Sequence, residues 1–304
     1  MTLRDTIRGT VDAHLNAGHL VMGQCLQAVG WVGNTLPKRY DMTELPCSDV
    51  AGAGFVVGAA LMGRRPIYVI RYQGFNWFNA PIILNYACKS LALWNRPCPL
   101  LIRSIAMEGG IGPVAGSSHH SLYYRMPGVS IYSPMTPMEF SVAYQEFMEG
   151  DGVVYLSEHR GAYDNDEELH DILHDKPDIV LFPISITRFA AMEAAIALHK
   201  RGVNVAVHHV FRVKPFMPSE QALEALRASR YGGVVLDDDY TNGIAKSLAH
   251  DLSDATGALM DVMGLEDRTA GFSNDNLPPS EEQIISKVLH IAGPRLRAVW
   301  GRRG

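Results

Sequence analysis

Cysteine is scarce in this sequence. Only four are present among 304 residues, Cys25, Cys47, Cys88 and Cys98, and no two of them form a Cys-x-x-Cys pair. A disulfide framework or a zinc site needs cysteines at closer and more regular spacing. The sequence therefore excludes a cross-linked or zinc-ribbon type of protein and predicts reduced thiols.

The sequence also lacks a long apolar run near its beginning and an excess of basic residues. Residues 1–15 mix acidic, basic and apolar side chains, whereas a secretory signal or a membrane span requires an uninterrupted apolar stretch. The formal net charge of -5 provides no basic field for nucleic acid or for an anionic membrane. We expect a cytoplasmic protein that binds neither nucleic acid nor membranes.

Hydrophobic residues, in contrast, are abundant. They make up 47% of the chain, which is enough to bury a large core and suggests about two domains. Short apolar runs at 66–72, 98–104 and 152–158 alternate with helical patterns at about 79–94 and 136–148. Strands that alternate with helices predict a parallel sheet with helices on both faces.

The same alternation resumes after a polar, acid-rich stretch at 164–178, which we interpret as a linker. The sequence thus predicts an α/β protein with two doubly wound, mostly parallel-sheet domains. The first domain is expected at residues 1–175, and a smaller second domain is expected at residues 176–304.

Two glycine motifs resemble cofactor-binding loops without the context that such loops need. Gly52, Gly54 and Gly58 resemble a dinucleotide-binding loop, but no buried strand precedes them and no acidic residue follows about 20 positions later. Close helix packing explains them better than a nicotinamide site.

The motif at 150–152, Gly-Asp-Gly, resembles the start of a magnesium-diphosphate motif, but a predicted strand follows at once. We interpret it as a turn, so the chain is not expected to anchor a diphosphate.

Histidine pairs occur at two places in the sequence. His119 and His120 lie in a polar loop before a Pro-Gly turn, where imidazoles can contact substrate oxygens or move protons near neutral pH. A single histidine pair does not predict a metal site. His208 and His209 lie at the end of an apolar strand, and we interpret them as structural.

Three consecutive acidic residues, Asp237, Asp238 and Asp239, end another predicted strand. Parallel sheets often bind ligands beyond the carboxyl ends of their strands. A ligand contact, a solvated turn and a contact between domains all remain open for these side chains.

The most specific pattern is one continuous segment, residues 47–89, which reads CSDVAGAGFVVGAALMGRRPIYVIRYQGFNWFNAPIILNYACK. An acidic residue opens a Gly/Ala-rich helix, Arg-Pro follows a short loop, a strand brings aromatic residues, and the next helix holds Asn and Ala-x-Lys. The residues are Asp49, Arg65-Pro66, Tyr72, Phe75, Asn85 and Ala87-Cys88-Lys89. This pattern resembles the core signature of the E1 β subunits of thiamine-diphosphate-dependent 2-oxo-acid dehydrogenases, in the transketolase-like superfamily. The resemblance continues through 126–140 and 153–163 and covers nearly the whole chain.

The resemblance implies a pyrimidine-binding domain, a transketolase-type C-terminal domain, and thiamine diphosphate shared with an α-type E1 subunit in a heterodimer or α2β2 assembly. The Mg²⁺ ion would be held mainly by the partner subunit. The β-type subunits would also associate with each other, and a lipoyl or carrier protein could be the acceptor. A carboxylate beside the pyrimidine ring would activate the cofactor. The implied catalytic residues are Asp49, His119 and His120, and the implied cofactor-binding residues are Asp49, Arg71, Tyr72, Phe75 and Gln24, with no metal ligand in this chain.

Three positions depart from the family pattern. Asp49 stands where the family has Glu, which shortens the reach of the carboxylate by about 1.5 Å. Gln24 stands where the family has a Glu that belongs to an acidic passage between active sites, and an amide does not carry a proton as a carboxylate does. The histidine of the family's substrate loop corresponds either to His120 or to Ala115.

Purely structural roles are the alternatives for two of these residues. Asp49 could serve only as a helix N-cap, a position that Asp fills well. Phe75 could be a core aromatic residue instead of a ring that stacks on a pyrimidine.

The predicted function is that of a β-type subunit which, with its partner, decarboxylates a 2-oxo acid or cleaves a ketol donor and transfers the acyl or two-carbon unit. A subunit of a split transketolase and a non-catalytic, structural or regulatory subunit are the alternatives.

Overall fold

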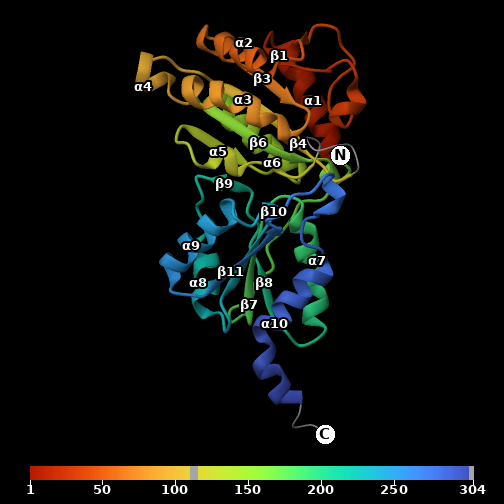
Figure 1. Cartoon of the computed structure of the whole chain (residues 1–304), viewed down its shortest axis with the longest axis vertical. Helices are drawn as coiled ribbons and strands as arrows, with labels where there is room; N and C mark the ends of the chain where they lie inside the picture. Colours follow the sequence, from red (N-terminus) through yellow and green to blue (C-terminus); the bar gives the residue numbers. More distant parts are fainter. Residues whose placement is uncertain (110–115, 301–304) are drawn as a thin grey trace. The chain divides into compact units, whose positions relative to one another are not determined.

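Two sheets divide the chain into two units in a computed structural model that describes residues 1–109 and 116–300 (Figure 1). Unit 1 comprises Met1–Leu169, Phe211–Pro215 and Thr269–Asn276, and unit 2 comprises the remaining described residues. None of the helices in the described part of the chain is both long enough and apolar enough to cross a membrane.

Unit 1 is built on a seven-stranded sheet with the order β2-β1-β3-β4-β6-β5-β9. Every neighbouring pair is parallel except β5 and β9, which are antiparallel. The strands are β1 (Leu20–Gly23), β2 (Thr43–Glu44), β3 (Pro66–Ile70), β4 (Leu100–Ala106), β5 (Val129–Tyr132), β6 (Val153–His159) and β9 (Arg212–Lys214). All residues of β3, β4 and β6 are buried, as expected for strands covered on both faces.

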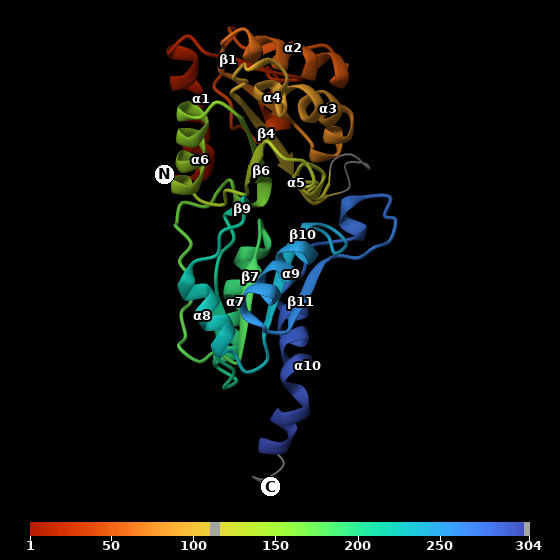
Figure 2. The same ribbon diagram turned by 90° about the vertical axis from the view of Figure 1, so that its left-hand side faces the viewer.

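The helices of unit 1 cover both faces of this sheet. They are α1 (Leu3–Asn16), α2 (Asp49–Leu61), α3 (Asn76–Ile82), α4 (Ser90–Trp94), α5 (Ser121–Tyr124) and α6 (Pro137–Glu149). Figure 2 shows α1 and α6 together on one side, with α2, α3 and α4 on the other. Local sequence explains where several of them begin: the Thr2 and Thr136 hydroxyls accept from backbone N–H groups in the first turns of α1 and α6.

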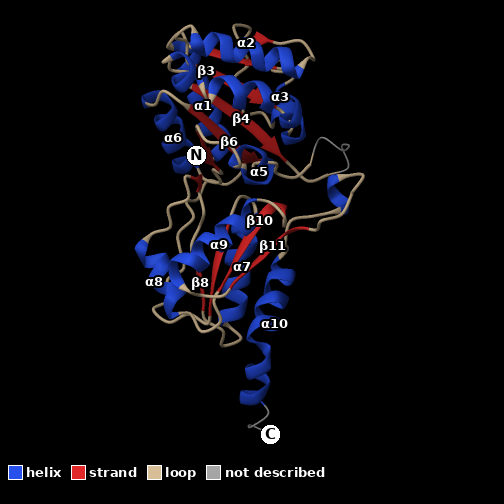
Figure 3. Ribbon diagram, turned by 60° about the vertical axis from the view of Figure 1, so that its left-hand side comes forward, coloured by secondary structure: helices blue, strands red, loops and turns tan. Residues whose placement is uncertain are grey.

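Unit 2 is built on a four-stranded parallel sheet with the order β11-β10-β7-β8. The strands are β7 (Ile179–Pro183), β8 (Val205–Val207), β10 (Gly233–Tyr240) and β11 (Met260–Leu265), and the helices are α7 (Thr187–His199), α8 (Glu220–Ala228), α9 (Ile244–Thr256) and α10 (Glu281–Trp300). Figure 3 shows this sheet between α8 and α9 on one side and α7 and α10 on the other. Aliphatic residues of β7, β10 and α7 form its core.

The predicted fold class is confirmed, and the differences in detail have local causes. The helical pattern at about 79–94 corresponds to three helical segments, because α3 is followed by a π-helical segment, Ile83–Ala87, and then by the separate helix α4. The strand expected at 66–72 ends at Ile70. The turn expected at 150–152 is confirmed, since α6 ends at Glu149 and β6 begins at Val153.

Candidate active-site half

Polar and aromatic side chains gather beyond the carboxyl edge of the sheet in unit 1. Since β1, β3, β4 and β6 are successive parallel neighbours, their carboxyl ends lie at one edge. Gln24 follows β1, residues 71–75 follow β3, and the chain that follows β4 leads to His119 and His120. Doubly wound sheets bind ligands at this edge.

Asp49 is the first residue of α2, and its carboxylate is held by two side-chain amides. Nε2 of Gln24 donates to Oδ1 over 3.3 Å, and Nδ2 of Asn79 donates to the same oxygen over 3.1 Å. Within the described residues, Oδ2 makes no hydrogen bond. The interpretation of Asp49 as an N-cap is wrong, because Ser48 occupies that position and the Asp49 side chain bonds to other elements. The Asp49 carboxylate is thus oriented through Oδ1, and its Oδ2 can accept a hydrogen bond from a ligand.

Asn79 connects this carboxylate to the segment after β3. Its Nδ2 also donates to the backbone oxygen of Phe75 over 2.9 Å, and its Oδ1 accepts from the Tyr68 hydroxyl over 2.6 Å. Burial and the Asp49 carboxylate both raise the pKa of Tyr68, so that the hydroxyl stays a donor. Hydrogen bonds at both Nδ2 and Oδ1 therefore fix the orientation of the Asn79 side chain.

Arg71, Tyr72 and Phe75 form an aromatic and cationic cluster after β3. The Arg71 guanidinium lies 5.4 Å from the Phe75 ring centroid, and the Tyr72 and Phe75 rings are 6.1 Å apart. Trp31 packs at 6.3 Å from Tyr72, and the Arg160 guanidinium lies 5.6 Å from the same ring. Tyr72 is buried and therefore belongs to the core, whereas Phe75 is half-buried and keeps part of its ring accessible.

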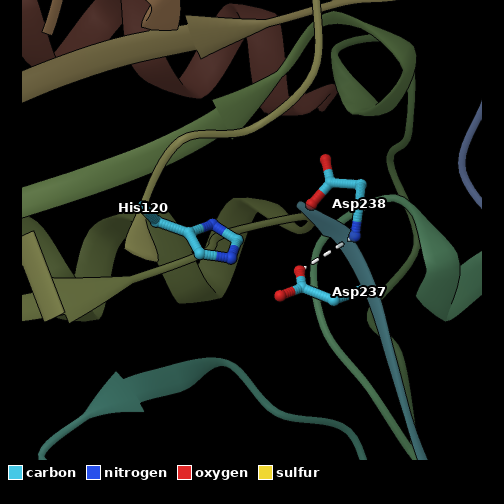
Figure 4. Close-up of side chains that lie close together, drawn as sticks. All are labelled: His120, Asp237 and Asp238. Atoms are coloured by element: carbon cyan, nitrogen blue, oxygen red, sulfur yellow. Dashed lines mark hydrogen bonds between the residues drawn. The ribbon is translucent and has the colours of Figure 1, made fainter. Parts of the chain in front are cut away.

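His119 and His120 are held differently although they are adjacent. His120 lies on the chain just before α5 (Figure 4). It is buried, and its Nδ1 lies 3.0 Å from the Ser157 hydroxyl. His119 is half-buried, and its ring meets Trp77 edge-on at 6.3 Å. Of the two histidines expected in a polar loop, His120 is therefore buried, while His119 keeps a partly accessible ring. Ala115, the other candidate for the family's histidine position, lies outside the described residues.

Two residues of this site were not predicted from the sequence. Asn79 orients Asp49, and Gln73 binds the backbone of His119 over 2.6 Å. Asn76 and Asn79 stand three apart and so share a helix face, which marks polar groups on an otherwise apolar segment. That spacing was the feature of the sequence that could have indicated a role for Asn79.

The candidate residues of unit 2 are also buried. Asp237 and Asp238 lie within β10, where Oδ1 of Asp237 accepts from the Asp238 backbone N–H over 2.9 Å (Figure 4). The Ser185 hydroxyl donates to Asp238 over 2.8 Å. The solvated-turn interpretation is therefore wrong. His208 follows β8 as predicted, with Nδ1 2.9 Å from the Asp171 carboxylate.

Comparison with known proteins finds similar sequences for part or most of this chain. Residues 29–166 match the family described as "Transketolase, pyrimidine binding domain", a range that includes Asp49, Phe75 and His119 but not Gln24. The chain is similar to the 2-oxoisovalerate dehydrogenase subunit beta of Bacillus subtilis, with 28% identity over 64% of this chain and 63% of the relative, so the match spans just under two thirds of that protein. It is also similar to the pyruvate dehydrogenase E1 component subunit beta of Chaetosphaeridium globosum, with 23% identity over 95% of both chains.

A solved structure shows the same fold over the whole length. The chain matches one titled "Split gene transketolase, inactive beta4 tetramer" with a TM-score of 0.72, 15% identity, and coverage of 96% of this chain and 98% of that one. Part of this chain thus matches the transketolase pyrimidine-binding domain, the chain is similar to E1 β subunits of 2-oxo-acid dehydrogenases, and its fold is that of a solved transketolase chain.

Proposed function

We propose that this chain supplies the pyrimidine half-site of a two-subunit thiamine-diphosphate enzyme. The observation that carries the proposal is the amide of Asn79, which bonds both the Asp49 carboxylate and the Phe75 backbone and so fixes a carboxylate relative to an accessible aromatic residue. A ring nitrogen of a pyrimidine needs a carboxylate beside it, and the flat heterocycle needs an aromatic face.

The residues present fit that half of the cofactor. Asp49 keeps Oδ2 for a ring nitrogen, Phe75 offers a half-buried face, and the Arg71 guanidinium lies 5.4 Å from the Phe75 ring. When bound, thiamine diphosphate supplies the electron sink for decarboxylating a 2-oxo acid or cleaving a ketol donor. Asp49 would hold and orient the pyrimidine, and His119 and His120 would contact substrate oxygens or move protons there.

An α-type partner is part of the proposal. The Gly-Asp-Gly motif at 150–152 forms the turn between α6 and β6, so the diphosphate and its Mg²⁺ would be held mainly by the partner, in a heterodimer or α2β2 assembly. Association between β-type chains is proposed as well, since the solved chain of the same fold is described as a β4 tetramer. The acceptor would be a lipoyl group, a carrier protein or an aldehyde, and the location cytoplasmic.

Calorimetric titration of thiamine diphosphate with Mg²⁺ tests the shared half-site. It should be performed on this chain alone, on the candidate α partner alone, and on the confirmed complex. Binding only in the complex supports the proposal. An absence of binding to a confirmed complex would instead favour the second candidate, a non-catalytic subunit retained for assembly or regulation.

That second candidate has a specific observation in its favour. Gln24 bonds directly to Asp49, so two positions at which the family has Glu now form an amide–carboxylate pair with one ionisable group fewer. Asp49→Glu and Asp49→Asn distinguish the candidates. In a catalytic complex the first variant should change kcat/KM by roughly a hundredfold through about 1.5 Å of altered reach, and the second should abolish turnover. A scaffold would be inactive in all three forms.

The split-transketolase alternative differs in donor and acceptor. It predicts transfer of a two-carbon unit from a ketol to an aldehyde, without reduction of a lipoyl group or an artificial electron acceptor. Assaying the active complex with both kinds of acceptor decides between them.

A further inference from the structure

Gln73 lies at the centre of a fully buried polar cluster between β3, β4, β6 and the histidine segment. Its side chain has no exposed surface, and neither do those of Tyr155 and Ser157 on β6. A buried amide whose donors or acceptor lack hydrogen-bond partners destabilises the folded protein. The partners of the Gln73 amide therefore indicate what this residue does.

The two ends of the Gln73 amide bind different parts of unit 1. Oε1 accepts from the backbone N–H of His119 over 2.6 Å and from the Tyr155 hydroxyl over 3.2 Å. Nε2 donates to the Ser157 hydroxyl over 2.8 Å and to the Ser104 backbone oxygen over 3.3 Å. Because a backbone N–H can only donate, the oxygen of the amide must face His119, and this fixes the orientation of the side chain.

The same short turn also carries the proposed cofactor contact. Gln73 and Phe75 belong to one 3-10 turn after β3, and the ring of His119 lies against Trp77, four residues after Gln73. Ser157, which accepts from Gln73, also lies 3.0 Å from Nδ1 of His120. One amide therefore joins the aromatic turn to both histidines.

We propose that Gln73 is a positioning residue that sets the distance between the cofactor-facing Phe75 turn and the His119–His120 segment. The inference rests on the proposed function, because it concerns where the histidines stand relative to bound cofactor and substrate. Gln73 itself has no exposed surface through which to meet a substrate.

Three variants test this role. Gln73→Asn shortens the reach by one methylene, about 1.5 Å, and separates the amide from the His119 N–H. Gln73→Glu keeps the acceptor for His119 but places a carboxylate against the backbone oxygens of Ser104 and Glu158, which repel it until the carboxyl group takes up a proton. Gln145→Asn makes the first change at an exposed position on α6 and serves as control.

Hydrogen exchange of the isolated chain gives the first readout. Peptides that contain residues 118–122 should exchange faster in Gln73→Asn than in the wild type or in Gln145→Asn, because the His119 N–H loses its acceptor. Peptides from α1 and α6 should not change. Unchanged exchange at 118–122 would overturn the inference.

Kinetics of the α-containing complex give the second readout. For Gln73→Asn we expect kcat/KM to fall about a hundredfold, while the Kd for thiamine diphosphate changes less than about threefold. Gln73→Glu should regain about tenfold in kcat/KM, relative to the wild type, between pH 8 and pH 5.5 as its buried carboxyl group is protonated. Equal losses of cofactor binding and rate, or no pH-dependent recovery, would overturn the inference. If the wild-type complex binds no cofactor while exchange at 118–122 still depends on Gln73, the proposed function fails and only the contact between Gln73 and the histidine segment stands.

Discussion

Asn79 donates a hydrogen bond from Nδ2 to Oδ1 of Asp49 over 3.1 Å, and this bond joins the first residue of α2 to the middle of α3. A carboxylate at the start of a helix could turn in several directions. The second amide, that of Gln24, approaches the same oxygen and leaves Oδ2 as the remaining acceptor. The direction of the proposed cofactor contact is thus set by two neutral side chains.

Asn79→Ala should weaken cofactor binding by the α-containing complex. A hydrogen bond to a charged group contributes about 1.5–3 kcal/mol, so we expect the Kd for thiamine diphosphate to rise between tenfold and about a hundredfold. Asn85→Ala is the control, because Asn85 is exposed and, among the described residues, its side chain bonds to the nearby Pro81 and Lys89. Calorimetric titration provides the measurement, and equal affinities in the two variants would contradict the assigned role of Asn79.

Glu158→Gln should strongly destabilise unit 1. Arg103 and Glu158 form an ion pair with no exposed side-chain surface, at 2.6 Å between Nε and Oε1 and 2.8 Å between Nη2 and Oε2. Burial alone would lower the pKa of Arg103, but the adjacent Glu158 carboxylate raises it, so the guanidinium remains charged.

Removing the charge of Glu158 leaves this cation buried without its counter-ion, at a cost of about 3–5 kcal/mol in the free energy of unfolding. Urea denaturation followed by tryptophan fluorescence measures this loss. The exposed Glu149→Gln should change stability by less than about 0.5 kcal/mol. A loss below about 1 kcal/mol in Glu158→Gln would show that the buried pair is dispensable.

The protein should lose stability as the pH falls from about 6.5 to about 4, with His14 as one cause. Its ring is buried between the Tyr144 hydroxyl and the Arg65 backbone oxygen, and burial together with His19 lowers the pKa of His14 to about 4. The unfolded chain takes up a proton near pH 6.5, before the folded protein does, so the contribution is complete above that pH and decreases below it.

The decrease attributable to His14 is about 3 kcal/mol at pH 4. In His14→Gln the difference in unfolding free energy between pH 7 and pH 4 should shrink by about that amount, whatever the variant's stability at pH 7. The exposed His250→Gln should keep the wild-type difference. An unchanged pH dependence in His14→Gln would refute the assignment.

Gly128→Ala should cost more stability than Gly63→Ala. Both glycines have positive φ angles, 84° and 83°, so the backbone penalty of a side chain is matched. A Cβ at Gly63 meets nothing within 4 Å, whereas one at Gly128 would overlap the backbone oxygen of Cys88. We expect about 1 kcal/mol for Gly63→Ala and about 1–3 kcal/mol more for Gly128→Ala, measured by denaturation. Equal costs would mean that the segment around Cys88 moves freely.

Much of the architecture could be read from local patterns. Apolar runs bounded by turn residues identified β3, β4 and β6, because a strand buried on both faces needs no polar alternation. Strands β2, β5, β9 and β11 were missed. β9 has only three residues and is a strand because it pairs with β5, a segment 80 positions away in the chain.

The sequence by itself determined the fold class, the start of α2 at Asp49, and the resemblance to a thiamine-dependent family, since each depends on residue types at close spacing. Only the tertiary structure decided that Asn79 and Gln24 meet at one oxygen of Asp49, that His120 is buried while His119 is not, and that Gln73 bonds the His119 backbone. These contacts join residues 25–46 positions apart, and the order in which strands pair brings them together. Local periodicity records which face of an element is apolar, but not which distant side chain will lie opposite it.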